Sequence, residues 1–235
     1  MNRRARRQFL SSAILAGAAL ALPGLSKPKP KPKPKPPAKP QQSEISPTED
    51  LMREHGVLRR VLLVYEQGVT ELGEGRSVQP ELFASSARLI QRFIEGYHEK
   101  LEEEQVFPRL EKLGKLSELT NVLRDQHKKG RQLTTEILKN ATAAGMGRSG
   151  RRQDLMEAVR RFSRMYRPHA AWEDTVAFPA FHQLFTAAEF EKLGDLFEEQ
   201  EHQMLGTGGF ESTMAELGQL EKAAGIDRLS FYTPS

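Results

Sequence analysis

One pattern occurs twice in this chain: HEKLEEEQVFPRL, which begins at His98, and HAAWEDTVAFPAF, which begins at His169. Both stretches share the frame H-x3-E-x4-F-P, and their starts are 71 residues apart. On an α-helix, a residue and its fourth neighbour lie about 40° apart around the axis, because each residue turns about 100°. The imidazole and the carboxylate of each copy, with Glu102 in the first and Glu173 in the second, therefore point the same way.

A weaker repeat lies upstream of each copy. His55 precedes the first copy by 43 residues, and His127 precedes the second by 42 residues. The chain thus consists of two copies of a helix pair, in which one helix carries a lone His and the next carries His-x3-Glu. This arrangement predicts an all-α fold, an up-down four-helix bundle with an additional C-terminal helix or two.

Four histidines and two glutamates on facing helices are the groups that a pair of metal ions needs inside such a bundle. Imidazole is a borderline ligand and carboxylate a hard one, so the mixture suits iron, manganese or zinc, and a carboxylate can bridge two ions. Six groups are too few to fill two octahedral ions, so open positions remain where a small molecule would bind. The alternative is that each His is a surface or hydrogen-bonded core residue, but packing alone does not require both residue types in both copies.

These stretches resemble the hemerythrin-like family, whose HHE cation-binding domains are four-helix bundles that hold a non-haem di-iron centre. The matching stretches are Glu54-His55, HEKLEEEQVFP from His98, Gln126-His127 and HAAWEDTVAFP from His169, which together span roughly residues 48–205. The resemblance implies two iron ions as the cofactor. The ligands that it implies are His55, His98, Glu102, His127, His169 and Glu173.

Two positions differ from the oxygen-carrying hemerythrins. Those proteins place a second His four residues after the third-helix His, where this chain has Arg131. They also end on His-x4-Asp, a spacing that Asp174 satisfies, but the repeat with His98 favours Glu173. The resemblance therefore implies metal binding, whereas reversible oxygen carriage does not follow from it.

The charge of the chain is divided unevenly. Residues 1–40 contain ten Lys or Arg and no acid, so a total of +4 leaves −6 for the remainder. An acidic domain argues against nucleic-acid binding, because phosphate contacts need a cationic face. The chain has no cysteine, which excludes thiolate-held zinc, iron–sulfur clusters, covalently attached haem and disulfides. A metal here would have only nitrogen and oxygen ligands.

Residues 1–26 are interpreted as a targeting segment outside the fold. The stretch RRQFL from Arg6 is a twin-arginine signature, and the apolar run after it is too short for an ordinary membrane span. Ala19 and Ala21 offer a cleavage site of small residues. We therefore expect the twin-arginine machinery to export the folded protein to the periplasm or beyond. If the segment stays uncleaved, it would tether the protein to the membrane.

Residues 27–45 form a linker that begins KPKPKPKPKPPAKP. Proline removes every second backbone donor and pushes the residue before it into extended geometry, so this linker should be a polyproline II rod of about 3.1 Å per residue. Two interpretations stay open. The rod is either a spacer in weak contact with anionic lipid or cell-wall polymer of the envelope, or a passive tether.

The metal-binding bundle is expected over residues 46–205. The sequence SPTE from Ser46 is a capping box with proline at the first helical position, so the first helix begins here and ends near Gly73. Further helices are predicted over residues 80–113, 116–140 and 153–185, with a Gly-, Ala- and Ser-rich loop over 141–152.

Several residues near the expected ligands have predicted positions or roles. Leu51, Leu58 and Leu62 share the helix face of His55, so this histidine should point inward. Gly56 and Gly130 lie near His55 and His127, where they either leave space beside a ligand or allow two helices to pack closely. Pro168 removes one backbone bond and should kink its helix just before His169. Trp172 and Val176 are expected near the faces of His169 and Glu173.

The C-terminal part, residues 206–235, is expected to hold a last helix over 209–224 and a tail. Before it, the sequence TAAE from Thr186 is a second capping box, which predicts a helix over 189–205. His182 should face solvent on the far side of its helix. His202 is a further ligand, a partner of a ligand or a surface residue beside two glutamates, and the last two readings are favoured.

The expected function is that of an exported non-haem di-iron protein that binds O2 or a related small oxidant or diatomic. The alternatives are a di-iron enzyme, acting in iron oxidation or in peroxide or nitric oxide reduction, and an iron storage or repair protein. Whether the protein is an enzyme stays open, because carriage and turnover use the same ligands and differ in redox tuning and solvent access.

Overall fold

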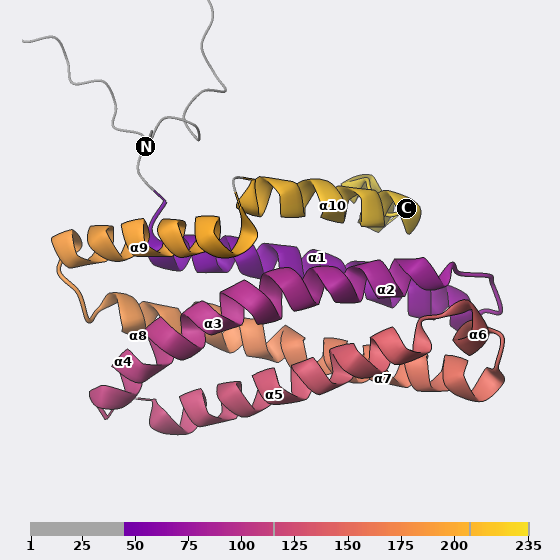
Figure 1. Ribbon diagram of the computed structural model, residues 1–235, viewed down its shortest axis with the longest axis horizontal. Coiled ribbons are helices and arrows are strands. Elements are labelled where there is room, and N and C mark those ends of the chain that lie inside the picture. Colours follow the sequence, from indigo (N-terminus) through magenta and orange to yellow (C-terminus); the bar gives the residue numbers. More distant parts are fainter. Residues whose placement is uncertain (1–44, 115, 207, 235) are drawn as a thin grey trace, which may run out of the picture. The chain divides into compact units, whose positions relative to one another are not determined.

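Four helical rods pack side by side in the computed structural model, which describes residues 45–114, 116–206 and 208–234 (Figure 1). The rods are α1 (Pro47–Gly73); α2 (Pro80–Leu89), η2 (Ile90–His98), α3 (Glu99–Leu101), η3 (Glu102–Val106) and α4 (Phe107–Lys112) in continuous succession; α5 (Ser117–Asn140); and α7 (Ser149–Trp172), η4 (Glu173–Ala177) and α8 (Phe178–His182) in continuous succession. Consecutive rods are neighbours, and α1 also contacts α7, so the bundle is closed. The predicted all-α fold is confirmed, and the described part of the chain contains no strand.

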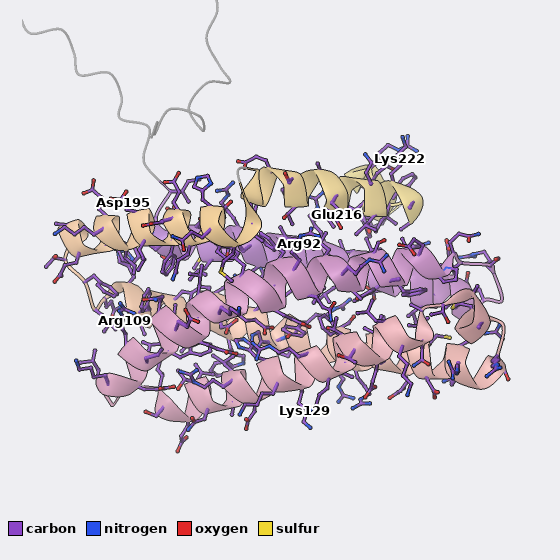
Figure 2. The ribbon with its side chains drawn as sticks, in the orientation of Figure 1. Arg92, Arg109, Lys129, Asp195, Glu216 and Lys222 are labelled. Atoms are coloured by element: carbon purple, nitrogen blue, oxygen red, sulfur yellow. The ribbon has the colours of Figure 1, made fainter. Side chains whose placement is uncertain are left out.

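Two further helices lie along the outside of this bundle. They are α9 (Ala187–Leu205) and α10 (Gly209–Ala223), and a 3-10 turn, η5 (Leu229–Tyr232), follows them. Both α9 and α10 pack against α1, and α10 also packs against α2 (Figure 1). Ion pairs fasten α10, since Arg92 lies 2.5 Å from Glu216 and Arg60 lies 2.5 Å from Glu221. Charged side chains without such a role, such as Lys129, point away from the bundle (Figure 2).

Both predicted capping boxes are present. Ser46 accepts a hydrogen bond from the backbone N–H of Glu49, whose carboxylate accepts one from the backbone N–H of Ser46. Thr186 and Glu189 make the same pair of bonds at the start of α9. Each box satisfies N–H groups that the first helical turn leaves without a partner inside the helix.

The segment predicted as a loop over residues 141–152 is partly helical, so that prediction is wrong over residues 143–146 and from Ser149 onward. A short helix, α6 (Ala143–Met146), begins where the Thr142 side chain accepts from the N–H of Gly145. The long helix α7 already begins at Ser149, earlier than expected. Its first turn needs no apolar residue, because Leu155 and Met156 in the following turns are buried and hold the helix against the bundle.

Wide helical turns occur at both Phe-Pro sequences. In η3 the N–H of Phe107 bonds to the carbonyl of Glu102, five residues back, and in η4 the N–H of Phe178 bonds to the carbonyl of Glu173. A proline follows each phenylalanine, and in a regular α-helix its ring would collide with the carbonyl four residues earlier. A π-turn relieves that collision. The repeated Phe-Pro thus places one widened turn directly at each expected ligand.

The kink expected at Pro168 is not where the helix becomes irregular. Helix α7 continues through Pro168 to Trp172, and the irregular turn is η4. The second rod has an additional π segment, η2, which the fourth rod lacks. Within η2, a Cβ on Gly96 would lie 2.9 Å from the carbonyl oxygen of Gln91, so a glycine suits this position.

The expected export signal over residues 1–26 and all but the last residue of the expected linker lie outside the described residues. Among the helices that are described, none has the length and apolar character needed to cross a membrane.

Candidate metal centre

The six expected ligands come together inside the bundle, and none of them is more than 3% exposed. Each of the four rods contributes at least one of them. The residues and their elements are His55 from α1, His98 from η2, Glu102 from η3, His127 from α5, His169 from α7 and Glu173 from η4.

The histidines form two pairs. His55 and His98, here called the first ligand pair, have ring centres 4.7 Å apart. His127 and His169, the second ligand pair, have ring centres 4.9 Å apart and Nε2 atoms 3.1 Å apart. The sequence repeat had joined each lone His to the His-x3-Glu that follows it, and the fold brings those same residues into one pair.

The two glutamates lie between the pairs. Glu102 is 3.6 Å from Nε2 of His98 and 3.4 Å from Nε2 of His127. In the same way, Glu173 is 3.1 Å from Nε2 of His169 and 3.2 Å from Nε2 of His55. Each carboxylate therefore contacts one histidine of each pair, as a bridging ligand would.

An acceptor outside the cluster holds the other nitrogen of each histidine. The Nδ1 contacts are His55 to Asp174 at 2.6 Å, His98 to Glu54 at 2.6 Å, His127 to Glu103 at 2.9 Å, and His169 to Gln126 at 2.9 Å. A carboxylate or amide oxygen accepts, so Nδ1 carries the hydrogen in the neutral ring and Nε2 turns its lone pair inward. Histidines that bind metals are commonly oriented in this way.

The inward atoms fit a cation better than they fit one another. Among the described residues, buried atoms without a hydrogen-bond partner include Nε2 of both histidines in the first ligand pair and all four oxygens of Glu102 and Glu173. The contacts near 3 Å among these groups thus lack hydrogen-bond geometry. Two lone pairs 3.1 Å apart also repel, yet two nitrogens at right angles on one ion, each bound at about 2.1 Å, would lie about 3.0 Å apart. The donor set therefore fits two metal ions.

The whole arrangement has an approximate two-fold symmetry that follows the sequence repeat. Glu54 and Gln126 occupy equivalent positions, and so do Glu103 and Asp174. The symmetry extends to the repeated phenylalanines, since Phe107 stacks on His127 at 5.6 Å and Phe178 stacks on His55 at 5.4 Å. No role was predicted for Glu54, Gln126 or Glu103, although their equivalent places in the two copies of the repeat were the signal that could have identified them.

Asp174 lies on the outer side of its histidine. It accepts from Nδ1 of His55 and also pairs with Arg59, whereas Glu173 reaches Nε2. Asp174 would therefore orient a ligand, and Glu173 is the carboxylate that faces the cluster.

Arg131, at the position where oxygen carriers have an additional histidine, turns away from the cluster. Its guanidinium donates to Glu99 at 2.8 Å and to Glu103 at 2.7 Å. Tyr166 donates to the same Glu99 at 2.6 Å. A Cβ on Gly130 would lie 2.0 Å from the hydroxyl oxygen of Tyr166, so this glycine permits close packing of α5 and α7. Gly56 has open space around its missing Cβ and makes no such approach.

Burial changes the proton affinity of the acidic groups. Burial raises the pKa of Glu54 to about 8 and raises that of Glu102 well above its usual range, the charge of Glu173 adding to the second effect. Burial also opposes the charged form of His55, but the hydrogen bond to Asp174 and the nearby carboxylate of Glu173 outweigh it and raise the pKa of His55 to about 9. A proton therefore competes with a metal ion for this imidazole, so metal binding should release protons.

Trp172, His182 and His202 play no part in the cluster. Trp172 is 54% exposed, so the expectation that it packs near the ligands is wrong. His182 is exposed as expected, although its ring stacks on Phe190 at 4.2 Å. His202 is exposed and lies 3.9 Å from Glu198, which agrees with its reading as a surface residue.

Comparison with known proteins gives the same picture as the geometry. The family model described as hemerythrin HHE cation binding domain matches residues 46–146 and again residues 118–223. The uncharacterized proteins Rv1995 of Mycobacterium tuberculosis and Mb2018 of Mycobacterium bovis are each 43% identical to this chain over 233 residues, which is 98% of this chain and 91% of theirs. No solved structure gives a significant match.

Proposed function

The chain belongs to the hemerythrin family of HHE cation-binding domains, and from this premise and the buried cluster we propose that it holds two iron ions and binds O2 or a related small oxidant or diatomic there. The family and the cluster of buried histidines and glutamates together indicate metal binding. The choice of iron and of the small ligand is our proposal. Manganese and zinc also suit these ligands.

The observation that carries the proposal is the set of inward-facing donor atoms. The first ligand pair would hold one ion and the second ligand pair the other, with Glu102 and Glu173 shared between them. Without a cation, these buried atoms lack partners, which is costly in a protein interior. Iron, when bound, would supply electrons to an oxidant and open positions for a small ligand. The chain contributes the dry interior and the fixed imidazole orientation.

Arg131 decides how many protein ligands each ion receives. Residue 131 is an arginine, so the second ligand pair gains no third histidine. The arginine side chain itself is paired with Glu99 and Glu103. Each ion would have two histidines and the shared carboxylates, which leaves open positions at both. This departure from the oxygen carriers favours a second candidate function, a di-iron enzyme that reduces peroxide or nitric oxide or oxidises iron. Iron storage or repair is the remaining alternative.

Anaerobic titration with ferrous iron, followed by native mass spectrometry, tests the metal content. We expect a plateau at two ions per chain, and a plateau at one ion or none would contradict the proposal. His182→Ala should leave the count unchanged, since this side chain lies outside the cluster, while His98→Ala and His169→Ala should each lose metal.

Spectra recorded during addition and removal of oxygen then separate the candidate functions. A charge-transfer band that appears with oxygen and disappears on its removal supports binding. Irreversible bleaching, or consumption of added peroxide, supports the enzyme. The same iron-loaded protein serves for the oxygen measurement and for the peroxide measurement, so the two results can be compared directly.

We also infer export through the twin-arginine route. The support is the sequence alone, in which paired arginines precede a short apolar run. Replacing Arg6 and Arg7 with Lys should trap the precursor in the cytoplasm, because an ammonium does not reproduce the planar guanidinium. Fractionation of cells that express this variant and the unchanged chain would decide it, and undiminished export would contradict the route.

A further inference from the structure

The two ligand pairs differ in the groups behind them, although they are matched in the groups that face the ions. Each pair has two imidazoles and contacts both shared glutamates. Behind the first ligand pair, both acceptors are carboxylates, Asp174 and Glu54. Behind the second ligand pair, one acceptor is the carboxylate of Glu103 and the other is the neutral amide of Gln126.

The carboxylate of Glu54 also differs from the other two in its surroundings. Asp174 pairs with Arg59, and Glu103 pairs with Arg131. Among the described residues, no guanidinium lies within ion-pair distance of Glu54, which is 2% exposed and accepts from His98 at 2.6 Å. Of the three carboxyl groups behind the ligand pairs, that of Glu54 therefore has the fewest cationic partners. The equivalent position behind His169 carries no charge at all.

This difference acts on a bound cation in two ways. An imidazole that donates its Nδ1–H to a carboxylate becomes a stronger ligand through Nε2 than one that donates to an amide. A buried carboxylate close to the site also attracts a cation directly, because charges interact more strongly in the interior than in water. Both effects favour the first ligand pair.

We infer that the two metal positions are inequivalent, and that a divalent cation fills the first ligand pair, His55 and His98, before the second, His127 and His169. Glu54 and Gln126 are positioning residues that set this order through the histidines they hold. The inference rests on the proposed two-metal function and goes beyond it, because the approximate symmetry of the ligands would predict equal filling.

Imidazole NMR signals can follow the order of filling directly. The chain has only six histidines, four in the cluster and two, His182 and His202, exposed outside it. Metal-free full-length protein with 15N-labelled histidine would be titrated with zinc, which is diamagnetic and does not change oxidation state. We expect the signals of the first ligand pair to move with the first equivalent and those of the second ligand pair with the second. The exposed histidines serve as internal references.

Charge exchange behind the ligands provides the decisive variants. Glu54→Gln should weaken zinc binding at the first ligand pair by about 10- to 100-fold, and Gln126→Glu should strengthen it at the second by a similar factor. The double exchange leaves the net charge unchanged and should reverse the order. Glu66→Gln, an equal change of charge at an exposed position on α1, should keep the original order.

The outcomes separate this inference from the proposed function. If zinc shifts all four cluster histidines together, or if the double exchange keeps the original order, two ions are bound but the inference is wrong. If zinc shifts none of them, the metal centre itself is refuted and the order with it. Gln126→Glu alone keeps the test decisive if Glu54→Gln does not fold, because it must bring the two steps closer together.

Discussion

The two ends of the bundle bury different kinds of side chain. One end, here called the polar end, holds the two ligand pairs and the shared glutamates. The other, the apolar end, is filled by hydrocarbon and aromatic side chains from the same four rods. Its central residues are no more than 1% exposed: Tyr65, Phe83, Ile137, Leu155 and Val159.

This difference shows where stability and function reside in the fold. Apolar groups gain free energy on burial without needing a partner. Imidazole and carboxylate atoms lose their hydration on burial, and this loss is costly unless a hydrogen bond, a proton or a metal ion compensates for it. The backbone differs as well, since the π-turns η3 and η4 lie at the polar end, whereas α2 and the facing part of α7 are regular. The apolar end should therefore support a polar end that is poorly stable without its ions.

Metal removal should have the largest effect on this balance. An ion that binds only the folded state, at a free concentration of about 1,000 times its Kd, adds about 4 kcal/mol to the free energy of unfolding. Stripping both ions with a chelator should therefore lower the free energy of unfolding by about 8 kcal/mol at that excess. Urea unfolding, followed by circular dichroism with and without chelator, would measure it. An unchanged midpoint would mean that the polar end needs no cation.

Truncation at the apolar end should come next. Phe83→Ala removes a fully buried ring that stacks with Tyr65, and we expect a loss of about 3–5 kcal/mol in both the metal-loaded and the metal-free protein. The number of bound ions should stay at two. Val122→Ala, at a position 53% exposed, is the control and should be nearly neutral. Loss of metal in the Phe83 variant would show that the two ends are not independent.

Three consecutive glutamates at the polar end offer a graded test. Glu102→Gln should abolish binding of both ions, because this carboxylate contacts both ligand pairs. Glu103→Gln should weaken binding about tenfold, because Glu103 only orients His127. Glu104→Gln, at an exposed position, should have no effect. Metal content measured by native mass spectrometry would rank them, and a Glu103 variant that loses metal while the Glu102 variant keeps it would refute the assignment.

The smallest expected effect is a pH dependence of the metal-free protein. Burial raises the pKa of Glu54 and of Glu99 to about 8, while the hydrogen bond to Asp174 and the nearby Glu173 outweigh the burial of His55 and raise its pKa to about 9. Between pH 7 and 9 the folded state therefore holds protons that the unfolded chain has released, so stability should fall as the pH rises. Thermal unfolding across this range, with Glu54→Gln for comparison, would measure the slope. Rising stability would contradict these shifts.

Helix starts and the residues of the buried cluster could be predicted from local sequence, because their causes are local. A capping box needs only residues within one turn, and both boxes, at Ser46 and Thr186, are present. The His-x3-Glu spacing puts two groups on one face of a single helix, and the cluster is built from those groups. The early start of α7 was missed, because the packing of Leu155 and Met156 that stabilises it depends on other helices.

The partners of the histidines could not be predicted in the same way. Glu54 precedes His55 in the chain, yet it bonds to His98 on another rod, and Asp174 reaches back to His55 across the bundle. Such pairs depend on how the rods face one another. The wrong prediction for Trp172 has the same cause. Trp172 follows His169 by three residues, but this spacing does not show which side of the rod other helices cover.

The position of Trp172 has a practical consequence. It is the single tryptophan of the chain, it is half in solvent, and the next residue is Glu173. The protein thus carries one natural fluorophore, on the residue that precedes a proposed iron ligand. Iron should quench its emission as loading proceeds, whereas zinc should not, so occupancy can be followed optically in the unmodified protein.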